Sequence, residues 1–159
     1  RELTFWNLGS LSGSSWSKIL LAGPVILIAT AFATTLAHGL NGLALGEASA
    51  HHIGIPVQRT KSLAILTVSG AAGAAVAVSG GIGFIGIVVP HLLRLATGPD
   101  HHGLLVNSAL LGASLLLLAD IFARFVVAPA ELPIGIVTAL IGTPVFMWIL
   151  LRQRGVVDL

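Results

Sequence analysis

Cysteine and tyrosine are absent from this sequence of 159 residues, and charged side chains are scarce. Without cysteine the chain forms no disulfide, and it has no thiolate for catalysis or for metal binding. Charged residues make up 9% of the sequence, with eight Lys or Arg against six Asp or Glu. A net charge of +2 without any basic run excludes a nucleic-acid-binding surface.

Hydrophobic residues, in contrast, make up 55% of the chain, and the mean hydropathy is +0.99. The few polar side chains do not suffice to coat a soluble globule of this length, so the composition indicates an integral membrane protein. Apolar runs long enough to cross a bilayer as helices predict an all-α, polytopic helical bundle. The predicted spans are residues 19–37, 62–79, 104–127 and 136–151. His38, Asn41 and the pair Gly39 and Gly42 are expected to end the first span.

The stretch 80–94 interrupts the longest charge-free run with four glycines within seven residues, followed by Pro90. In a bilayer, unpaired backbone groups are tolerated only where protein or a water-filled cavity satisfies them, so a broken span indicates a transport pathway or tight packing. Because proline is favoured as a first helical residue, we expect a re-entrant half-helix over 91–96. The candidate residues for a translocation path or gate are Gly83, Phe84, Gly86, Pro90, His91 and Arg94.

His91 and Arg94 are the ionisable groups of this region, and such groups inside membrane segments are functional candidates. The alternative is a histidine hydrogen-bonded in the interior and an arginine whose head reaches the lipid headgroups. Residues 81–86 also match the GxGxxG fingerprint of dinucleotide binding. That fingerprint requires a preceding strand, whereas an apolar helical span precedes it here and Pro90 follows, so we predict no nucleotide site.

Residues 43–61 form the one polar amphipathic stretch, and we expect one or two short helices there, outside the bilayer. Gly54 followed by Pro56 predicts a helix stop. Glu47, His51 and His52 are conceivable metal ligands, but adjacent histidines point to different sides of a helix and no third group of ligands is near. We therefore predict no metal site.

Basic residues at 59 and 61, at 94, and at 152 and 154 predict the sidedness of the chain. Under the positive-inside rule, the segment 43–61, the loop 95–103 and the C-terminus face the cytoplasm. This parity requires that the region 80–96 crosses back. Asp120 and Arg124 stand four residues apart near the end of the third span, so we expect a structural ion pair that neutralises itself.

Four motifs carry a resemblance to a known family: NGLALGE at 41–47, GFIGIVVPHLLRL at 83–95, LLGASLLLLAD at 110–120 and AELPIGIVTALIGTPVF at 130–146. With these motifs the chain resembles the iron-siderophore, haem and cobalamin permeases of bacterial ABC importers (FecCD-like). The resemblance covers nearly the whole chain and corresponds to the C-terminal half of a ten-span permease. We therefore expect residues 1–159 to be a single permease domain that is a fragment of a longer protein.

The resemblance implies a multi-pass subunit of the bacterial inner membrane that pairs with a second permease copy, as a homodimer, amid membrane lipid. It implies two ATP-binding subunits that hold ATP and Mg²⁺, and a periplasmic substrate-binding protein. The chain has no GxxxxGK[ST] motif, so we expect neither an enzyme nor a bound cofactor. Segment 43–61 is similar to the family's cytoplasmic coupling helices, and the residues expected to dock on the ATPase are Leu45, Gly46, Glu47, Ala50, His51, Gly54, Pro56 and Arg59.

Residues 5–11 and 90–102 resemble haem permeases most, so haem or another iron chelate is the expected substrate, with ferric siderophores and cobalamin as alternatives. His91 is not expected to be an axial iron ligand, because the Pro-His-x-x-Arg pattern also occurs in permeases for the other substrates. An ion-coupled secondary transporter is an alternative that needs an ionisable residue deep in a span, for which His91 is the candidate. A purely structural membrane subunit needs neither the broken span nor the polar stretch.

Overall fold

A computed structural model describes residues 9–126 and 133–157, and every regular element in these ranges is an α-helix. Four of the helices, α2, α5, α7 and α8, are long and apolar enough to cross a membrane. The prediction of an all-α, multi-span fold is therefore confirmed. The helices are α2 (Trp16–Thr35), α3 (Ala37–Ala44), α4 (Glu47–His52), α5 (Val57–Ser79), α6 (Ile85–Thr97), α7 (His101–Val126) and α8 (Ile134–Val157).

The clearest difference from the predicted spans is the start of α5, at Val57 instead of residue 62. The charges of Arg59 and Lys61 had excluded this turn from the apolar run, although a helix accepts charged side chains where its first turn reaches water. The predicted polar segment 43–61 thus overlaps the end of α3, contains all of α4, and includes the first turn of α5.

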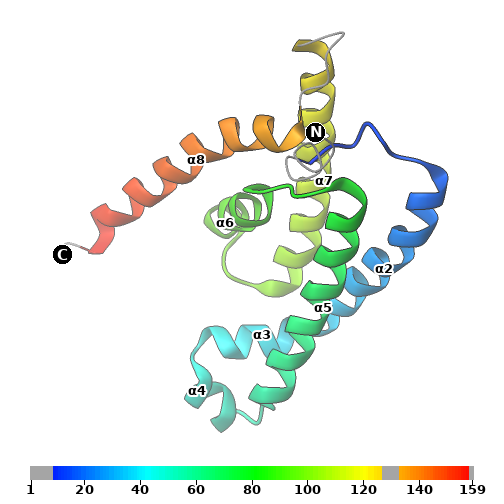
Figure 1. Ribbon diagram of the computed structural model, residues 1–159. Helices are drawn as coiled ribbons and strands as arrows, with labels where there is room; N and C mark the ends of the chain where they lie inside the picture. The colour runs from blue at the N-terminus through cyan, green and yellow to red at the C-terminus, as the bar shows by residue number, and fades with distance from the viewer. Residues whose placement is uncertain (1–8, 127–132, 158–159) are drawn as a thin grey trace.

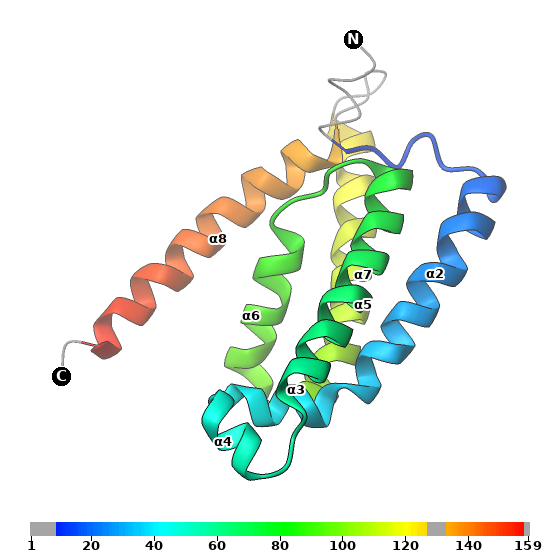
Figure 2. The ribbon, with the colours of Figure 1, turned by 60° about the horizontal axis from the view of Figure 1, so that its bottom comes forward.

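Helices α3 and α4 lie together at one end of the molecule, which we call the α4 end (Figure 1). Helices α2, α5 and α7 run between this end and the opposite one, and α2 packs along α5. Figure 2 shows α6 beside α7, and it shows α8 leading away from the other helices towards its C-terminus. The bundle therefore consists of two closely packed pairs, α2 with α5 and α6 with α7, with α8 at the side.

Residues 9 and 10 connect helix ends on the opposite side, which we call the Gly9 end. The N–H of Ser10 donates to the carbonyl oxygen of Ser79, the last residue of α5, at 2.8 Å. The N–H of Ile134, the first residue of α8, donates to the carbonyl oxygen of Gly9 at 3.1 Å. The segment before α2 therefore fixes the ends of α5 and α8 relative to each other.

Gly39 and Gly42 lie inside α3, so the prediction that they end a helix is wrong. The preceding helix ends earlier, at Thr35. A Cβ atom on Gly39 would lie 2.7 Å from Cγ2 of Thr60, and one on Gly42 would lie 1.9 Å from Cδ1 of Ile55. The two glycines serve close packing of α3 against the residues that enter α5, as small residues do between membrane helices.

The predicted interruption after α5 is present, but α6 begins at Ile85 and Pro90 lies inside it. Pro90 is therefore not the first residue of the half-helix, as the sequence had predicted. A proline in a helix interior removes one backbone hydrogen bond, here to the carbonyl of Gly86, and the buried Val88 and Val89 hold the helix in place. With 13 residues, about 20 Å, α6 is too short to cross a hydrocarbon core of about 30 Å.

Helix α6 returns the chain towards the α4 end (Figure 2). Asn41 of α3 donates from Nδ2 to Oδ1 of Asp100, just before α7, at 2.7 Å. The loop 95–103 and the segment 43–61 thus lie at the same end, and the predicted return of residues 80–96 is confirmed.

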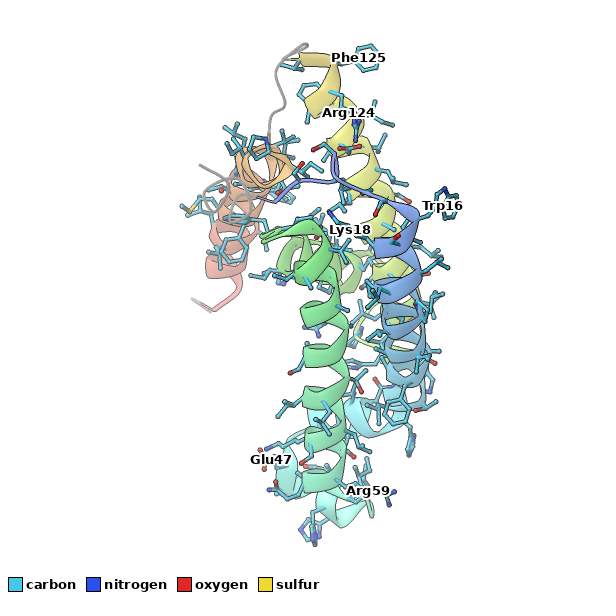
Figure 3. All side chains as sticks on the ribbon, turned by 45° about the vertical axis from the view of Figure 1, so that its right-hand side comes forward. Trp16, Lys18, Glu47, Arg59, Arg124 and Phe125 are labelled. Atoms are coloured by element: carbon cyan, nitrogen blue, oxygen red, sulfur yellow. The ribbon has the colours of Figure 1, made fainter. Side chains whose placement is uncertain are left out.

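The two ends of the bundle carry different side chains (Figure 3). Trp16 and Phe125, with exposed fractions of 79% and 84%, lie near one end. The amphipathic ring of a tryptophan such as Trp16 is favoured at a membrane–water interface. Lys18 and Arg124 lie towards this same end, and Arg59 lies at the α4 end. Cationic side chains therefore occur at both ends of the described bundle, and the sidedness of the chain stays a prediction.

Replacing Gly9 by alanine is expected to lower the stability of the protein. Gly9 has φ +70°, and an added Cβ atom would lie 2.7 Å from the backbone oxygen of Gly81. A left-handed alanine costs roughly 1–3 kcal/mol before the clash is counted. The measurement is the thermal unfolding midpoint of the detergent-purified transporter that contains this chain. Gly70→Ala is the matched control, because a Cβ atom there meets nothing within 4 Å; equal midpoints for the two variants would contradict the prediction.

Candidate functional site

Phe84 marks the break between α5 and α6. Within residues 9–126 and 133–157 it is the one residue other than glycine with a positive φ, at 64°. A bulky residue in this region is strained, and such strain is found where the surrounding structure enforces it. A Cβ atom on Gly142 of α8 would lie 2.7 Å from Cβ of Phe84, so the glycine lets α8 approach the strained residue closely.

Phe84 lines two neighbouring hollows. The larger, about 630 Å³, lies between the break and the first half of α8. The smaller, about 300 Å³, lies between α6, α7 and α8 and is almost wholly apolar. Movement of this ring would therefore change both spaces together. The larger hollow is lined by Gly81, Gly83, Phe84, Gly135, Ile136, Ala139, Leu140, Thr143 and Pro144.

The six predicted path or gate residues do not gather at one point. Gly83 and Phe84 line the larger hollow, and a Cβ atom on Gly86 would meet nothing within 4 Å. His91 is half-buried further along α6, and Arg94 is exposed in its last turn. The structure thus places the predicted residues at different points between the break and the last turn of α6. Their role as a translocation path stays a prediction.

The described residues contain no group of three or more His, Asp or Glu side chains that could hold a metal ion. Glu47, His51 and His52, weighed above as ligands, lie on α4 without a further ligand. Residues 81–86 follow an α-helix instead of the strand that a dinucleotide fingerprint requires.

The α4 end presents an exposed surface built on a small core. Ala50, Ile55 and Val57 are buried there, and Leu43 packs against them. Leu45 is 70% exposed, although it is apolar and lies outside the long helices. A single exposed apolar side chain is common at protein surfaces, so Leu45 does not by itself define a contact surface, and its docking role stays a prediction.

Four of the predicted docking residues, Glu47, His51, Pro56 and Arg59, line one open hollow of about 600 Å³ between α4 and the start of α5. Gly46 and Gly54, at φ +102° and +84°, are exposed and form the turns on either side of α4. Ala50 is completely buried, so it holds α4 in place and is not available for contact with another protein.

The structure adds a contact within this surface, because Nζ of Lys61 forms an ion pair with Oε1 of Glu47. The exposed fractions of the two side chains are 39% and 61%, so Glu47 still faces solvent. Lys61 is the last residue of the predicted polar segment 43–61, and the first turns of α5 position it. The pair joins α4 to α5.

Asp120 and Arg124 are in contact, with Nε of Arg124 donating to Oδ2 of Asp120 at 2.9 Å. The neighbouring Ala119 and Ala123 pack against α8. The pair lies on α7 towards the Gly9 end (Figure 3). Its purely structural role stays a prediction.

Several residues of these sites were missed in the sequence. The contact of Gly142 with Phe84 was not predicted, because a lone glycine in an apolar run does not reveal which side chain will approach it. Asn41 was interpreted as part of a helix end and of the motif at 41–47, and neither predicts that its amide contacts residues about 60 positions further along. For Gly142, the one signal of close packing in the sequence was its position in a long apolar run.

Four helices long and apolar enough to cross a membrane, an interrupted helix and a short helical segment outside them define the described part of the chain as a polytopic α-helical membrane protein. Comparison of the sequence with known families assigns the protein to a narrower class. The chain belongs to the FecCD transport family, whose model matches residues 1–152. The resemblance identified from the motifs is thereby confirmed.

The chain is 49% identical over 154 residues to the hemin transport system permease protein HmuU of Yersinia pestis, covering 97% of this chain and 46% of that protein. It is 44% identical over 154 residues to the vitamin B12 import system permease protein BtuC of Citrobacter koseri, covering 97% and 46%. A solved structure assigned to the metal-chelate type of ABC transporter, in an inward-facing conformation, matches with a TM-score of 0.89 and 36% identity, covering 95% of this chain and 49% of that one. The chain spans about half the length of the curated relatives it matches.

Replacing Gly142 by alanine is expected to destabilise the protein by roughly 1–3 kcal/mol, because the new Cβ atom overlaps Cβ of Phe84. Gly112→Ala on α7 is the control, since its Cβ atom would make an ordinary contact of 3.7 Å with Ile85. Thermal unfolding of the purified transporter measures both.

Phe84→Gly should suppress most of the cost of Gly142→Ala, because it removes both the overlapping atom and the backbone strain. A double-mutant cycle with a coupling of at least about 1 kcal/mol is expected for residues in contact. Strict additivity of the two substitutions would refute the close approach.

Proposed function

We propose that this chain forms part of the transmembrane permease of an ATP-driven importer that moves haem or another iron chelate from the periplasm to the cytoplasm. The observation that carries the proposal is the 49% identity to a hemin permease over 97% of this chain. The interrupted helix supports it, because irregular backbone at membrane depth is tolerated where it lines a pathway or is packed by protein. Residues 1–159 then act as one permease domain within a longer protein.

In this proposal the protein is a multi-pass protein of the bacterial inner membrane, with the α4 end and the C-terminus in the cytoplasm. The loop that holds Asp100 shares this end with Asn41, in keeping with that assignment. A second permease copy completes the translocation path, and a periplasmic substrate-binding protein delivers the substrate at the Gly9 end.

Two separate ATP-binding subunits supply the energy, and ATP and Mg²⁺ are held by them and not by this chain. The docking surface is the exposed face of the α4 end, with Leu45 and the hollow beside Glu47 and Arg59. Closure of the ATPases on nucleotide changes their contacts with this face, and the difference in contacts between two states drives the permease.

The path is proposed to follow the break and α6, with Phe84 as its mobile constriction. The ring lies between two hollows of about 630 and 300 Å³. Their largely apolar lining suits a large chelate with an apolar surface, because it provides few hydrogen-bond partners that would hold the substrate. His91 and Arg94 then lie along the way to the α4 end.

Ferric siderophores and cobalamin are the alternative substrates, the second favoured by the 44% identity to a vitamin B12 permease. An ion-coupled secondary transporter fits less well. Such a carrier needs an ionisable group deep in a span. The candidate His91 lies half-buried on α6, a helix too short to cross the bilayer by itself, and Asp120 is paired with Arg124 towards one end of α7.

Uptake by the complete importer in proteoliposomes distinguishes these functions. We expect haem accumulation that requires ATP inside the vesicles and survives collapse of the proton gradient. Ferric siderophore and cobalamin are the comparison substrates in the same vesicles. Transport of cobalamin without haem would favour the alternative substrate, and uptake driven by a proton gradient without ATP would overturn the ATP-driven mechanism.

Reversing the charge of Glu47 tests the docking surface. Glu47→Lys places a like charge beside Lys61 and alters the face offered to the ATPase, and a close like-charge contact at an interface costs several kcal/mol. We expect transport and stimulated ATP hydrolysis to fall roughly tenfold or more, with unchanged insertion, since an exposed pair contributes little to folding.

The exchange Glu47→Lys with Lys61→Glu is the matched control, because it restores the internal ion pair and keeps the reversed charge at position 47. Failure of the exchange to restore transport is expected if Glu47 contacts the ATPase. Full recovery would show that only the internal pair matters and would contradict the docking role.

A further inference from the structure

A polar junction joins the segment at the α4 end to the beginning of α7. Asn41 of α3 donates from Nδ2 to Oδ1 of Asp100 at 2.7 Å. Its Oδ1 accepts from the backbone N–H of His101 at 2.9 Å and lies 2.7 Å from Nδ1 of the same residue. Its Nδ2 also lies 3.4 Å from Nδ1 of His102, so one half-buried amide contacts three consecutive residues about 60 positions further along the chain. We call Asn41, Asp100, His101 and His102 the Asn41 junction.

The junction satisfies backbone groups at the start of α7. Oδ1 of Asp100 accepts from the N–H of His102 at 3.2 Å, as an N-cap side chain does, and lies 3.0 Å from its Nδ1. The N–H of His101, which has no partner within the helix, is taken by Asn41 instead. The start of α7 is thus capped by two residues: Asp100, directly before it, and Asn41 of the distant helix α3.

The charge of Asp100 fits this arrangement. The hydrogen bond from Asn41, and after it those from His102, lower the pKa of Asp100 to about 2. The carboxylate is therefore ionised at neutral pH, and a negative charge at a helix N-terminus is favourable. An acceptor that is always ionised keeps the amide of Asn41 in one orientation.

Other contacts make this junction a mechanical connection as well as a cap. Helix α4 is joined to α5 by Glu47 with Lys61, whereas the Asn41 junction joins α3 to the start of α7. Helix α6 packs along α7, with Val88 and Val89 buried, and the strained Phe84 is the residue directly before its first turn. A displacement of α3 that pulls on the start of α7 would therefore move α6 as well.

We propose that Asn41 is a positioning residue that transmits movement of the segment 43–61 to the α6–α7 pair, and through it to Phe84. The proposal rests on the proposed ATP-driven import. Hydrolysis at the partner subunits then does not depend on Asn41, whereas the amount of substrate moved for each ATP does.

The test is the exchange of amide and carboxylate across the junction. Asn41→Asp places a second carboxylate beside Asp100, where Nδ2 of Asn41 now donates to Oδ1 of Asp100 at 2.7 Å. The two negative charges then repel each other. In the complete importer, reconstituted with its ATPases and binding protein, we expect haem moved per ATP to fall about tenfold, the loss typical of a broken hydrogen bond to a charged group. The double variant Asn41→Asp with Asp100→Asn restores a donor opposite an acceptor at the same net charge, and it should recover most of the ratio.

The control is Asn107→Asp, the same chemical change at an exposed position of α7 outside the junction, which should leave the ratio near the unaltered value. A merely structural cap would lower the amount of folded importer, and transport and hydrolysis together, with the ratio unchanged. That result, or a double variant that stays uncoupled at normal abundance, overturns the proposal. If the unaltered importer moves none of the chelates, the proposed function fails instead, whatever the variants do.

Discussion

The backbone break after α5 is the constraint on which the rest of the structure depends, because peptide groups at membrane depth need partners inside the protein. The carbonyl of Ser79 accepts from the N–H of Ser10, and the N–H of Ile85 donates to the carbonyl of Gly83, each at 2.8 Å. The first of these bonds draws the segment before α2 across the end of α5, and Gly9 extends the same connection to α8. The break therefore fixes the relative positions of the helices on either side of it.

Phe84 shows how the break is held in a strained form. Its φ of 64° is unfavourable for a residue with a side chain, and proteins retain such a conformation where the packing around it is firm. The ring lines both hollows beside α8, and Gly142 lets the backbone of α8 come close. A relaxed conformation would turn the start of α6 and move the ring out of this position, so the strain and the packing oppose each other at one residue.

The sequence predicted the helical class, the approximate spans, the broken element and the polar segment, because each depends on composition within a short window. It did not predict that α6 starts at Ile85, because the rule that favours proline at a helix start is weaker than the packing of Val88 and Val89. The contacts of Asn41 with Asp100 and of Glu47 with Lys61 join residues on different helices, and no local pattern encodes such pairs. Gly39 and Gly42 were misinterpreted for the same reason, since their partners Thr60 and Ile55 lie beyond the next turn.

The attachments of the α4 end lead to the two packed pairs of helices separately. Glu47 with Lys61, and Gly39 against Thr60, connect it to α5, which packs along α2; Asn41 connects it to α7, which packs along α6. A rotation of this end would thus displace the two pairs by different amounts, because their attachment points differ. Between the pairs the chain is continuous only through residues 80–84, where the backbone has already left the helix. The difference in displacement must be absorbed there, next to Phe84, and the broken backbone is the part of the chain that can absorb it without losing helical hydrogen bonds.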